Sequence, residues 1–178
     1  VGAALADTSA GLDAGRAYII FGKLGFAEVN LAALTPTDGI ALNGSEAGGW
    51  FGLSVAGAGD VNADGIDDVV VSGALEDGDA GADSGRVWVV FGTQAPADID
   101  MATAEANAQA IAIDGGQDGA GIGSVAGAGD VNGDGFADII VGARRADGNG
   151  TAYVVFGDGG PFDPLLDVAT MDADTGFA

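Results

Sequence analysis

The nine residues SVAGAGDVN occur twice in the chain, as Ser54–Asn62 and again, letter for letter, as Ser124–Asn132, 70 residues further on. The octapeptide GRAYIIFG at Gly15–Gly22 returns at the same distance as GRVWVVFG, Gly85–Gly92, and a third time as GTAYVVFG, Gly150–Gly157. A long period of this kind is typical of propellers and solenoids, in which each repeat is one structural unit. The repeats therefore determine the expected class of fold.

Within one period, the apolar segments are predicted to be β-strands, because they are short, rich in Val and Ile, and bounded by Gly, Asp and Asn. The Ala-rich connection Ala97–Gln109 leaves both a short helix and an irregular segment open. Four strands per unit form a propeller blade, so the sequence predicts an all-β chain of β-propeller blades with four antiparallel strands each. The expected strands are Trp50–Ala56, Asp68–Ser72, Arg86–Phe91 and Ala110–Ile113, with earlier counterparts of the last two at Arg16–Phe21 and Ile40–Leu42.

Counted in this period, the chain divides into a first unit at residues 1–70, a second at 71–140 and a partial third at 141–178. Both ends fall inside a unit, because Val1–Ala3 matches Val141–Ala143 and Gly176–Ala178 matches Gly39–Ala41. About two and a half blades cannot close a ring of four to eight, and an open stack leaves sheet faces bare. We expect further blades of a longer polypeptide to cover them, the alternative being other copies of the chain.

The composition limits the chemistry. Among 178 residues, 27 are acidic and 5 basic, and the formal charge of −22 argues against binding to nucleic acid or anionic lipid. Without Cys or His, the chain has no disulfide, no thiolate or imidazole metal ligand, and no Cys or Ser–His nucleophile. The hydrophobic fraction of 48% suits a folded core, whereas no apolar stretch is long enough for membrane insertion. Carboxylate side chains are therefore the remaining candidates for metal binding or catalysis.

Two nine-residue loops, Asp60–Asp68 and Asp130–Asp138, share the pattern D-x-N-x-D-G-x-x-D. Oxygen ligands at positions 1, 3 and 5 turn toward one point, Gly at position 6 permits the sharp turn, and position 7 can add its carbonyl. An EF-hand would need Glu at position 12, where Val71 and Val141 stand, so we expect the Asp at position 9 to close the shell instead. Oxygen donors alone favour Ca²⁺. The alternative is a metal-free turn, since Asp, Asn and Gly favour turns anyway, but two complete copies favour the metal.

These residues resemble FG-GAP repeats, the units of the integrin α-subunit β-propeller that also occur in bacterial extracellular proteins. The resemblance rests on Phe51-Gly52, Gly57–Asp60, the calcium loop, Val69–Val71 and Gly85–Phe91. It implies a seven-bladed ring in the complete protein, with calcium loops between the first two strands of a blade. In the second copy, Gly121-Ile122 stands where the first has Phe51-Gly52, and we expect a weaker aromatic contact there.

The resemblance also implies two Ca²⁺ sites. Their ligands would be Asp60, Asn62, Asp64, the Ile66 carbonyl and Asp68 in the first, and Asp130, Asn132, Asp134, the Phe136 carbonyl and Asp138 in the second.

Outside the loops, one repeat position carries an aromatic residue in all three copies, as Tyr18, Trp88 and Tyr153. Packing between neighbouring blades is the favoured interpretation, and sugar binding is the alternative. Trp50 has no counterpart in the second copy and is a candidate for an exposed contact. The acidic loop Glu76–Asp83 is expected to stay solvated, with weak additional Ca²⁺ binding as the alternative.

Together these patterns predict a non-catalytic, calcium-binding extracellular module with a structural or adhesion role, and protein or glycan surfaces as candidate partners. Millimolar external Ca²⁺ would keep such loops filled. One alternative is a structural subunit that assembles with its own copies into a ring or filament. Another is the accessory propeller of a secreted hydrolase, because carboxylate pairs can hydrolyse glycosides; here, however, every carboxylate in a recognisable motif is assigned to metal.

Overall fold

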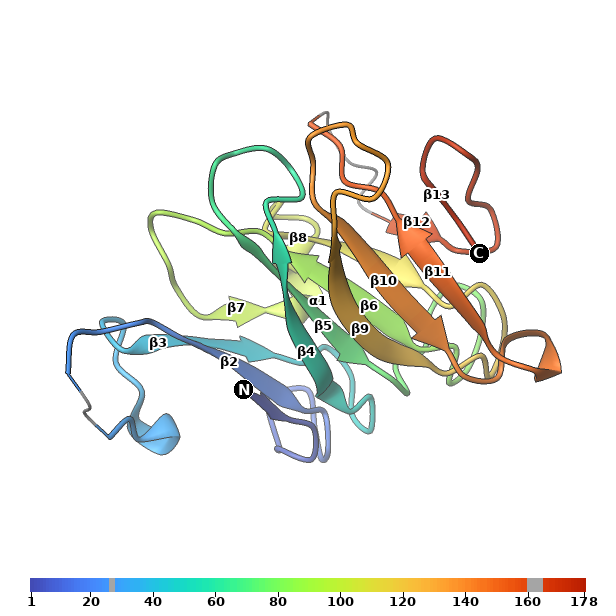
Figure 1. Cartoon of the computed structure of the whole chain (residues 1–178). Coiled ribbons are helices and arrows are strands. Elements are labelled where there is room, and N and C mark those ends of the chain that lie inside the picture. The colour runs from blue at the N-terminus through green and yellow to red at the C-terminus, as the bar shows by residue number, and fades with distance from the viewer. Residues whose placement is uncertain (26–27, 160–164) are drawn as a thin grey trace.

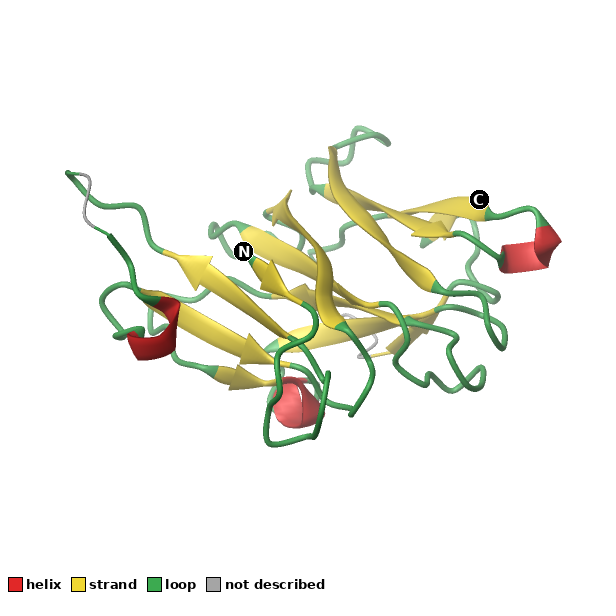
Figure 2. Ribbon diagram, turned by 90° about the horizontal axis from the view of Figure 1, so that it is seen from below, coloured by secondary structure: helices red, strands yellow, loops and turns green. Residues whose placement is uncertain are grey.

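The computed structural model describes residues 1–25, 28–159 and 165–178. Three twisted β-sheets stand one beside the next in chain order, with the loops gathered at their ends (Figures 1 and 2). Helical structure in the described residues is confined to α1 (Met101–Ala104) and two 3₁₀ turns, η1 (Leu31–Ala33) and η2 (Ala146–Gly148). The predicted all-β fold is confirmed.

The middle sheet is a complete blade. Its strands β4 (Phe51–Gly59), β5 (Asp68–Gly73), β6 (Arg86–Val90) and β8 (Ala110–Asp114) are antiparallel to their neighbours, in the order β8-β6-β5-β4. Their bounds agree with the four strands predicted from the sequence to within one residue, except that β4 continues three residues further, to Gly59. One face of β5 carries Val69 and Val71 and the other carries Val70, because successive side chains alternate across a strand. The sheet is therefore apolar on both faces.

The flanking sheets repeat this arrangement. The third contains β9 (Ile122–Gly129), β10 (Asp138–Ala143), β11 (Thr151–Val155) and β13 (Gly176–Phe177), in the order β13-β11-β10-β9. The first contains β1 (Gly2–Ala3), β2 (Arg16–Ile20) and β3 (Gly39–Asn43), which correspond to the second, third and fourth strands of the other blades. The three sheets thus form a partial β-propeller.

The connection between the third and fourth strands of a blade reaches back to the preceding blade. β7 (Ile99–Asp100) pairs in parallel with β3, and β12 (Leu165–Asp167) pairs in parallel with β8. After each added strand an Asp caps the next turn, since Asp100 accepts the Ala102 amide and Asp167 the Ala169 amide. The segment that the sequence left open is therefore a short strand followed by a helical turn, and it ties adjacent blades together.

Two hydrophobic cores lie between successive blades. The core between the second and third sheets includes Val70, Val87, Val89, Ile111 and Ile113, together with Ile122, Ile139, Val141 and Val155. The core between the first and second sheets includes Ala17, Ile40 and Leu42, together with Phe51, Val71, Trp88, Val90 and Met101. Burial of these side chains joins the sheets, because each blade is apolar on both faces.

The register of the first strands differs by one residue from the expected alignment. Phe51 pairs with Gly73 and Ile122 with Ala143, and both side chains are fully buried. Ile122 therefore takes the place of Phe51. Gly121 takes the place of Trp50, and both residues have positive φ, 61° at Gly121 and 55° at Trp50. The expected match of Gly121-Ile122 with Phe51-Gly52 is wrong, because β4 has one residue more, at the irregularity between Phe51 and Val55.

Glu76 belongs to the loop that the sequence placed in solvent, but its side chain is only 1% exposed. Its carboxylate accepts the indole N–H of Trp88 at 2.9 Å and the hydroxyl of Ser45 at 3.0 Å. Ser45 follows β3, so the carboxylate joins the loop of one blade to the loop of the preceding one. Burial raises the pKa of Glu76, while the hydrogen bonds from Trp88 and Ser45 and the charge of Arg86 lower it.

Replacement of Glu76 by Gln should change how stability depends on pH. Because the pKa is raised in the folded state, the native chain holds a proton that the unfolded chain releases first, so its free energy of unfolding falls as pH rises through that window. The Gln variant has no titrating group at this position, so its free energy of unfolding does not fall in this way. From about pH 4 upward, the free energy of unfolding of E76Q, measured with urea, should rise relative to that of the wild type. The rise should be about 1.4 kcal/mol for each pH unit over which only the folded wild-type chain keeps the proton. The exposed replacement Glu28→Gln is the control, and parallel profiles for E76Q and wild type would contradict the expectation.

Candidate functional site

The two Asp-rich loops occupy equivalent positions in the second and third blades. The first joins β4 to β5 and the second joins β9 to β10, so both lie at the same end of the sheets, at the upper edge of Figure 1. Gly65 and Gly135, at position 6 of the pattern, have φ values of 85° and 98°. Residues with a Cβ resist this left-handed conformation, which explains why the turn needs glycine.

In the first loop, side-chain oxygens bind the backbone of the loop itself. Asp60 accepts the amides of Asp64 at 3.1 Å and Gly65 at 2.9 Å, and Asn62 also accepts the Asp64 amide, at 3.0 Å. Asp64 in turn accepts the Ile66 amide at 2.8 Å. These bonds fold the segment around the side chains at positions 1, 3 and 5.

The second loop repeats the same contacts. Asp130 accepts the amides of Asp134 at 3.1 Å and Gly135 at 3.0 Å, Asn132 accepts the Asp134 amide at 3.0 Å, and Asp134 accepts the Phe136 amide at 2.9 Å. These four bonds are shared by both loops, and the second loop adds one from the Gly133 amide to Asp130 at 2.7 Å. The shared bonds are therefore a property of the pattern and not of one local environment.

The Asp at position 9 lies deeper than the others. Asp68 is 1% exposed and accepts the amides of Val61 and Gly92, both at 2.8 Å. Asp138 is fully buried and accepts the amides of Val131 at 2.7 Å and Gly157 at 2.9 Å. Each carboxylate therefore links its loop to the second residue after the third strand of the blade. This second partner was not predicted from the sequence, although a Gly follows that strand in all three copies.

Charge accumulates around Asp68. Burial raises the pKa of this carboxyl, and the nearby charges of Asp64 and Asp60 raise it further, while the hydrogen bonds from Gly92 and Val61 lower it. Positions 1, 5 and 9 of the loop are thus close enough to repel one another. A cation bound among them would relieve this repulsion.

The donor set suits a hard cation, because every predicted ligand is an oxygen. Neither the Ile66 nor the Phe136 carbonyl accepts a hydrogen bond from a described residue, which leaves both available to a metal. Within the described ranges, however, no three acidic side chains are gathered as a ready-made metal centre. The oxygens are instead directed to the amides named above, and the ligand assignment stays a prediction.

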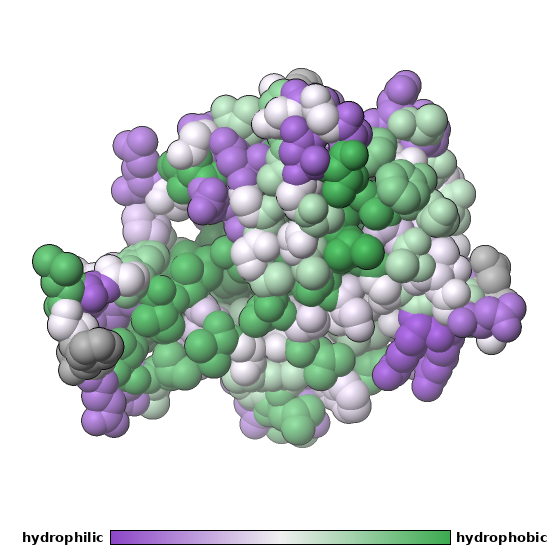
Figure 3. Space-filling model, in the orientation of Figure 1, coloured by the Kyte–Doolittle hydropathy of each residue, from purple (hydrophilic) through white to green (hydrophobic). Residues whose placement is uncertain are grey.

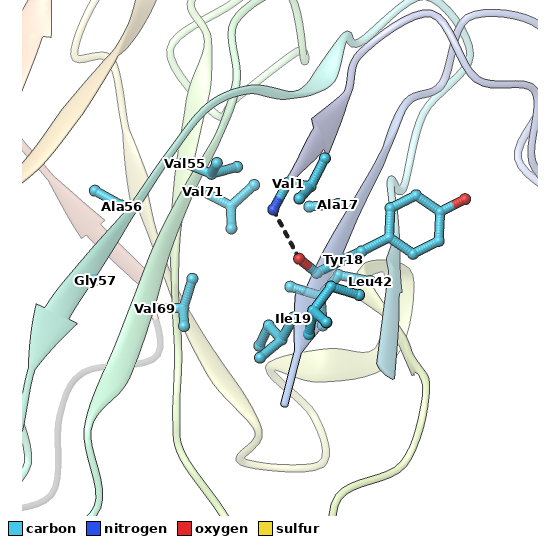
Figure 4. A pocket seen from close by; sticks show the side chains of 11 residues that line it. Val1, Ala17, Tyr18, Ile19, Leu42, Val55, Ala56, Gly57, Val69 and Val71 are labelled. Carbon is cyan, nitrogen blue, oxygen red and sulfur yellow. Dashed lines mark hydrogen bonds between the residues drawn. The ribbon is translucent and has the colours of Figure 1, made fainter. Parts of the chain in front are cut away.

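A second feature is an apolar groove of about 280 Å³ between the first two blades. Val1 lies against β2, with its amino group 2.8 Å from the Tyr18 carbonyl, and the groove opens beyond it (Figure 4). Val55, Val69 and Val71 line the opposite wall. In the space-filling view, apolar residues gather in this region, between the first and second sheets (Figure 3).

The complete blades show what fills the corresponding space. In the middle sheet, Val69 and Val70 of β5 pair with the last two residues of β6. In the first sheet, the equivalent residues of β2 are Ile19 and Ile20, and the described pairing with β1 stops before them. The groove therefore lies along the edge of β2 at Ile19 and Ile20.

Comparison with known proteins supports the repeat assignment. The family model described as FG-GAP repeat matches residues 51–90 and 122–155, which run from the first residue of β4 to the last of β6 and from the first of β9 to the last of β11. No curated protein sequence shows a significant match. No helix among the described residues has the length and apolar character needed to span a membrane. Two of the three sheets thus carry FG-GAP repeats, each a three-stranded core around an Asp-rich loop.

Proposed function

We propose that the chain is a non-catalytic, calcium-stabilised part of a β-propeller that acts outside the cell in adhesion or surface structure. The observation that carries the proposal is the second occurrence of one loop pattern, with the same Asp, Asn and Gly positions and four shared hydrogen bonds. FG-GAP repeats occur in extracellular proteins, where millimolar Ca²⁺ is available to such sites.

Electrostatics supports a bound cation. Each loop contributes three proposed ligand carboxylates within nine residues, in a protein whose formal charge is already −22. Two Ca²⁺ ions would reduce that charge to −18 and would neutralise the mutual repulsion of Asp60, Asp64 and Asp68. The proposed ligands are those at positions 1, 3, 5, 7 and 9 of each loop.

The proposal assigns no catalytic step to this chain. The carboxylates of the recognisable motifs serve the loops, and neither Cys nor His is present as a nucleophile or proton carrier. An accessory role beside a secreted hydrolase would place the chemistry in a different domain.

Calcium binding should be measurable by titration calorimetry, with two ions per chain. Asp64→Asn and Asp134→Asn should each reduce the number to one, because each removes one ligand charge. Asp67→Asn is a matched control, since Asp67 lies in the same loop, is exposed, and has Ala137 in the corresponding position of the second loop. This control should still bind two ions. Unchanged binding in both Asp64→Asn and Asp134→Asn would refute the assignment.

Thermal unfolding gives an independent measurement of the same ions. At a Ca²⁺ concentration about 100 times the dissociation constant, each site adds about 2.7 kcal/mol to the free energy of unfolding. Chelation should therefore lower the melting temperature, and Asp67→Asn should respond like the wild type.

Association with further blades is a second proposal, carried by the outer faces of the first and third sheets. Across the third sheet, Ile140, Val154 and Phe177 form one row, and the equivalent row in the middle sheet is Val70, Val89 and Ile111. The middle row is at most 5% exposed because the third blade covers it, whereas Ile140 is 37% and Phe177 54% exposed. The outer face is thus built like a junction face, and its partner is another blade of this type, in a longer chain or in a second copy.

Sedimentation velocity tests the version with a second copy. The isolated chain should associate as its concentration rises, and the double replacement Ile140→Lys and Phe177→Lys should weaken association by at least about tenfold, because burying each side chain is worth about 1.5–3 kcal/mol. Leu24→Lys is the control, since Leu24 is fully exposed in a loop. A chain that stays monomeric at all concentrations would contradict self-assembly. The blades that cover the outer faces would then have to belong to a longer polypeptide.

A further inference from the structure

An open hollow of about 320 Å³ lies between the second and third blades, at the end of the sheets opposite the Asp-rich loops. It is lined by Gly115, Gly116 and Gln117, which follow β8, by Tyr153 of β11, and by Val168 and Ala169, which follow β12. Its residues come from two complete blades, and none of them belongs to a loop proposed to bind calcium.

The junction between the first and second blades shows how this space is normally filled. Asn43 and Asp114 occupy the same register position, opposite Arg16 and Arg86, so Ser45 corresponds to Gly116. Trp88 corresponds to Tyr153, since they pair with Val71 and Val141. In the same way Met101 corresponds to Val168, because each follows the Asp that ends its parallel strand.

At the first junction these side chains fill the space. Trp88 is 2% exposed and Met101 1%, and Glu76 and Ser45 complete the packing through the hydrogen bonds described above. At the second junction every corresponding side chain is smaller: Tyr153 for Trp88, Val168 for Met101, Ala146 for Glu76 and Gly116 for Ser45. The hollow is therefore specific to one junction and is not a general property of this fold.

The lining is polar but uncharged. Tyr153 contributes a half-buried ring, and its hydroxyl makes no hydrogen bond to any residue that the structure describes. Gln117 adds an amide, Gly115 and Gly116 expose backbone, and Val168 and Ala169 supply methyl groups. Among the residues that the structure describes, no carboxylate or basic side chain lines the hollow to hold an ion, and the net charge of −22 disfavours anions.

From this chemistry we propose that the hollow binds a single neutral sugar residue of a glycan. Such a ligand combines hydroxyl groups, which would meet Gln117, the Tyr153 hydroxyl and the glycine backbone, with an apolar ring face, which would rest on the aromatic ring. The volume lies at the lower end of the range of small-molecule pockets, which fits one ring and not a long chain.

The test uses neutral methyl glycosides of glucose, galactose, mannose and N-acetylglucosamine, titrated into isotope-labelled protein and followed by NMR in saturating Ca²⁺. At least one should bind with a dissociation constant of about 1 mM and shift signals around Tyr153. Tyr153→Phe should weaken binding by about three- to tenfold through the lost hydroxyl. Tyr18→Phe, at the same repeat position in the first blade, is the matched control and should bind like the wild type.

A second variant fills the hollow. Val168→Met with Tyr153→Trp copies the first junction and should reduce glycoside affinity by at least about tenfold without lowering the melting temperature. Failure of all four glycosides to bind, unchanged binding in the filled variant, or equal binding of glucuronate or glucosamine would overturn the proposal. Repeating the titration with Asp64→Asn and Asp134→Asn separates this site from the proposed calcium sites, since both variants should keep glycoside binding.

Discussion

Face-to-face packing of sheets governs this structure. A strand such as β5 directs Val69 and Val71 to one side and Val70 to the other, so no blade has a face suited to water. Each sheet buries apolar side chains against its neighbour, and the two cores of the described chain are both junctions rather than interiors of single sheets. The Asp-rich loops, the parallel strands β7 and β12 and the Glu76 contact all lie around these junctions, and they hold in place the blades that apolar burial brings together.

The two junctions show how a repeat diversifies without changing its fold. The second and third strands of the middle and third blades pair in the same register, yet one junction is closed by a buried carboxylate and a Trp, and the other leaves space beside a Tyr. Substitutions at these positions alter the space between blades while the paired strands stay intact. Differences between repeats are therefore better indicators of individual function than the residues that the repeats share, which maintain the common frame.

The sequence predicted the strands and the position of the loops, because a 70-residue period and Val-rich runs between turns are signals carried by neighbouring residues. It could not predict that Glu76 is buried, since a loop full of Asp gives no indication that Trp88 and Ser45 meet above one of its members. The parallel pairing of β7 was equally hidden, because Ile99 and Asp100 form a two-residue strand whose partner lies in another blade. The second partner of Asp68 was missed for the same reason: Gly92 is distant along the chain.

The parallel strands also affect synthesis. The outer edge of β3 is covered by β7, and that of β8 by β12, in each case by a segment more than fifty residues further along the chain. At a translation rate of about 5–20 residues per second, each blade would wait roughly three to ten seconds for its last strand after its own sheet had emerged. A nascent chain would thus expose the unpaired edge of its most recently completed sheet until the next parallel strand is synthesised. Chaperones would be expected to bind the growing protein at that edge.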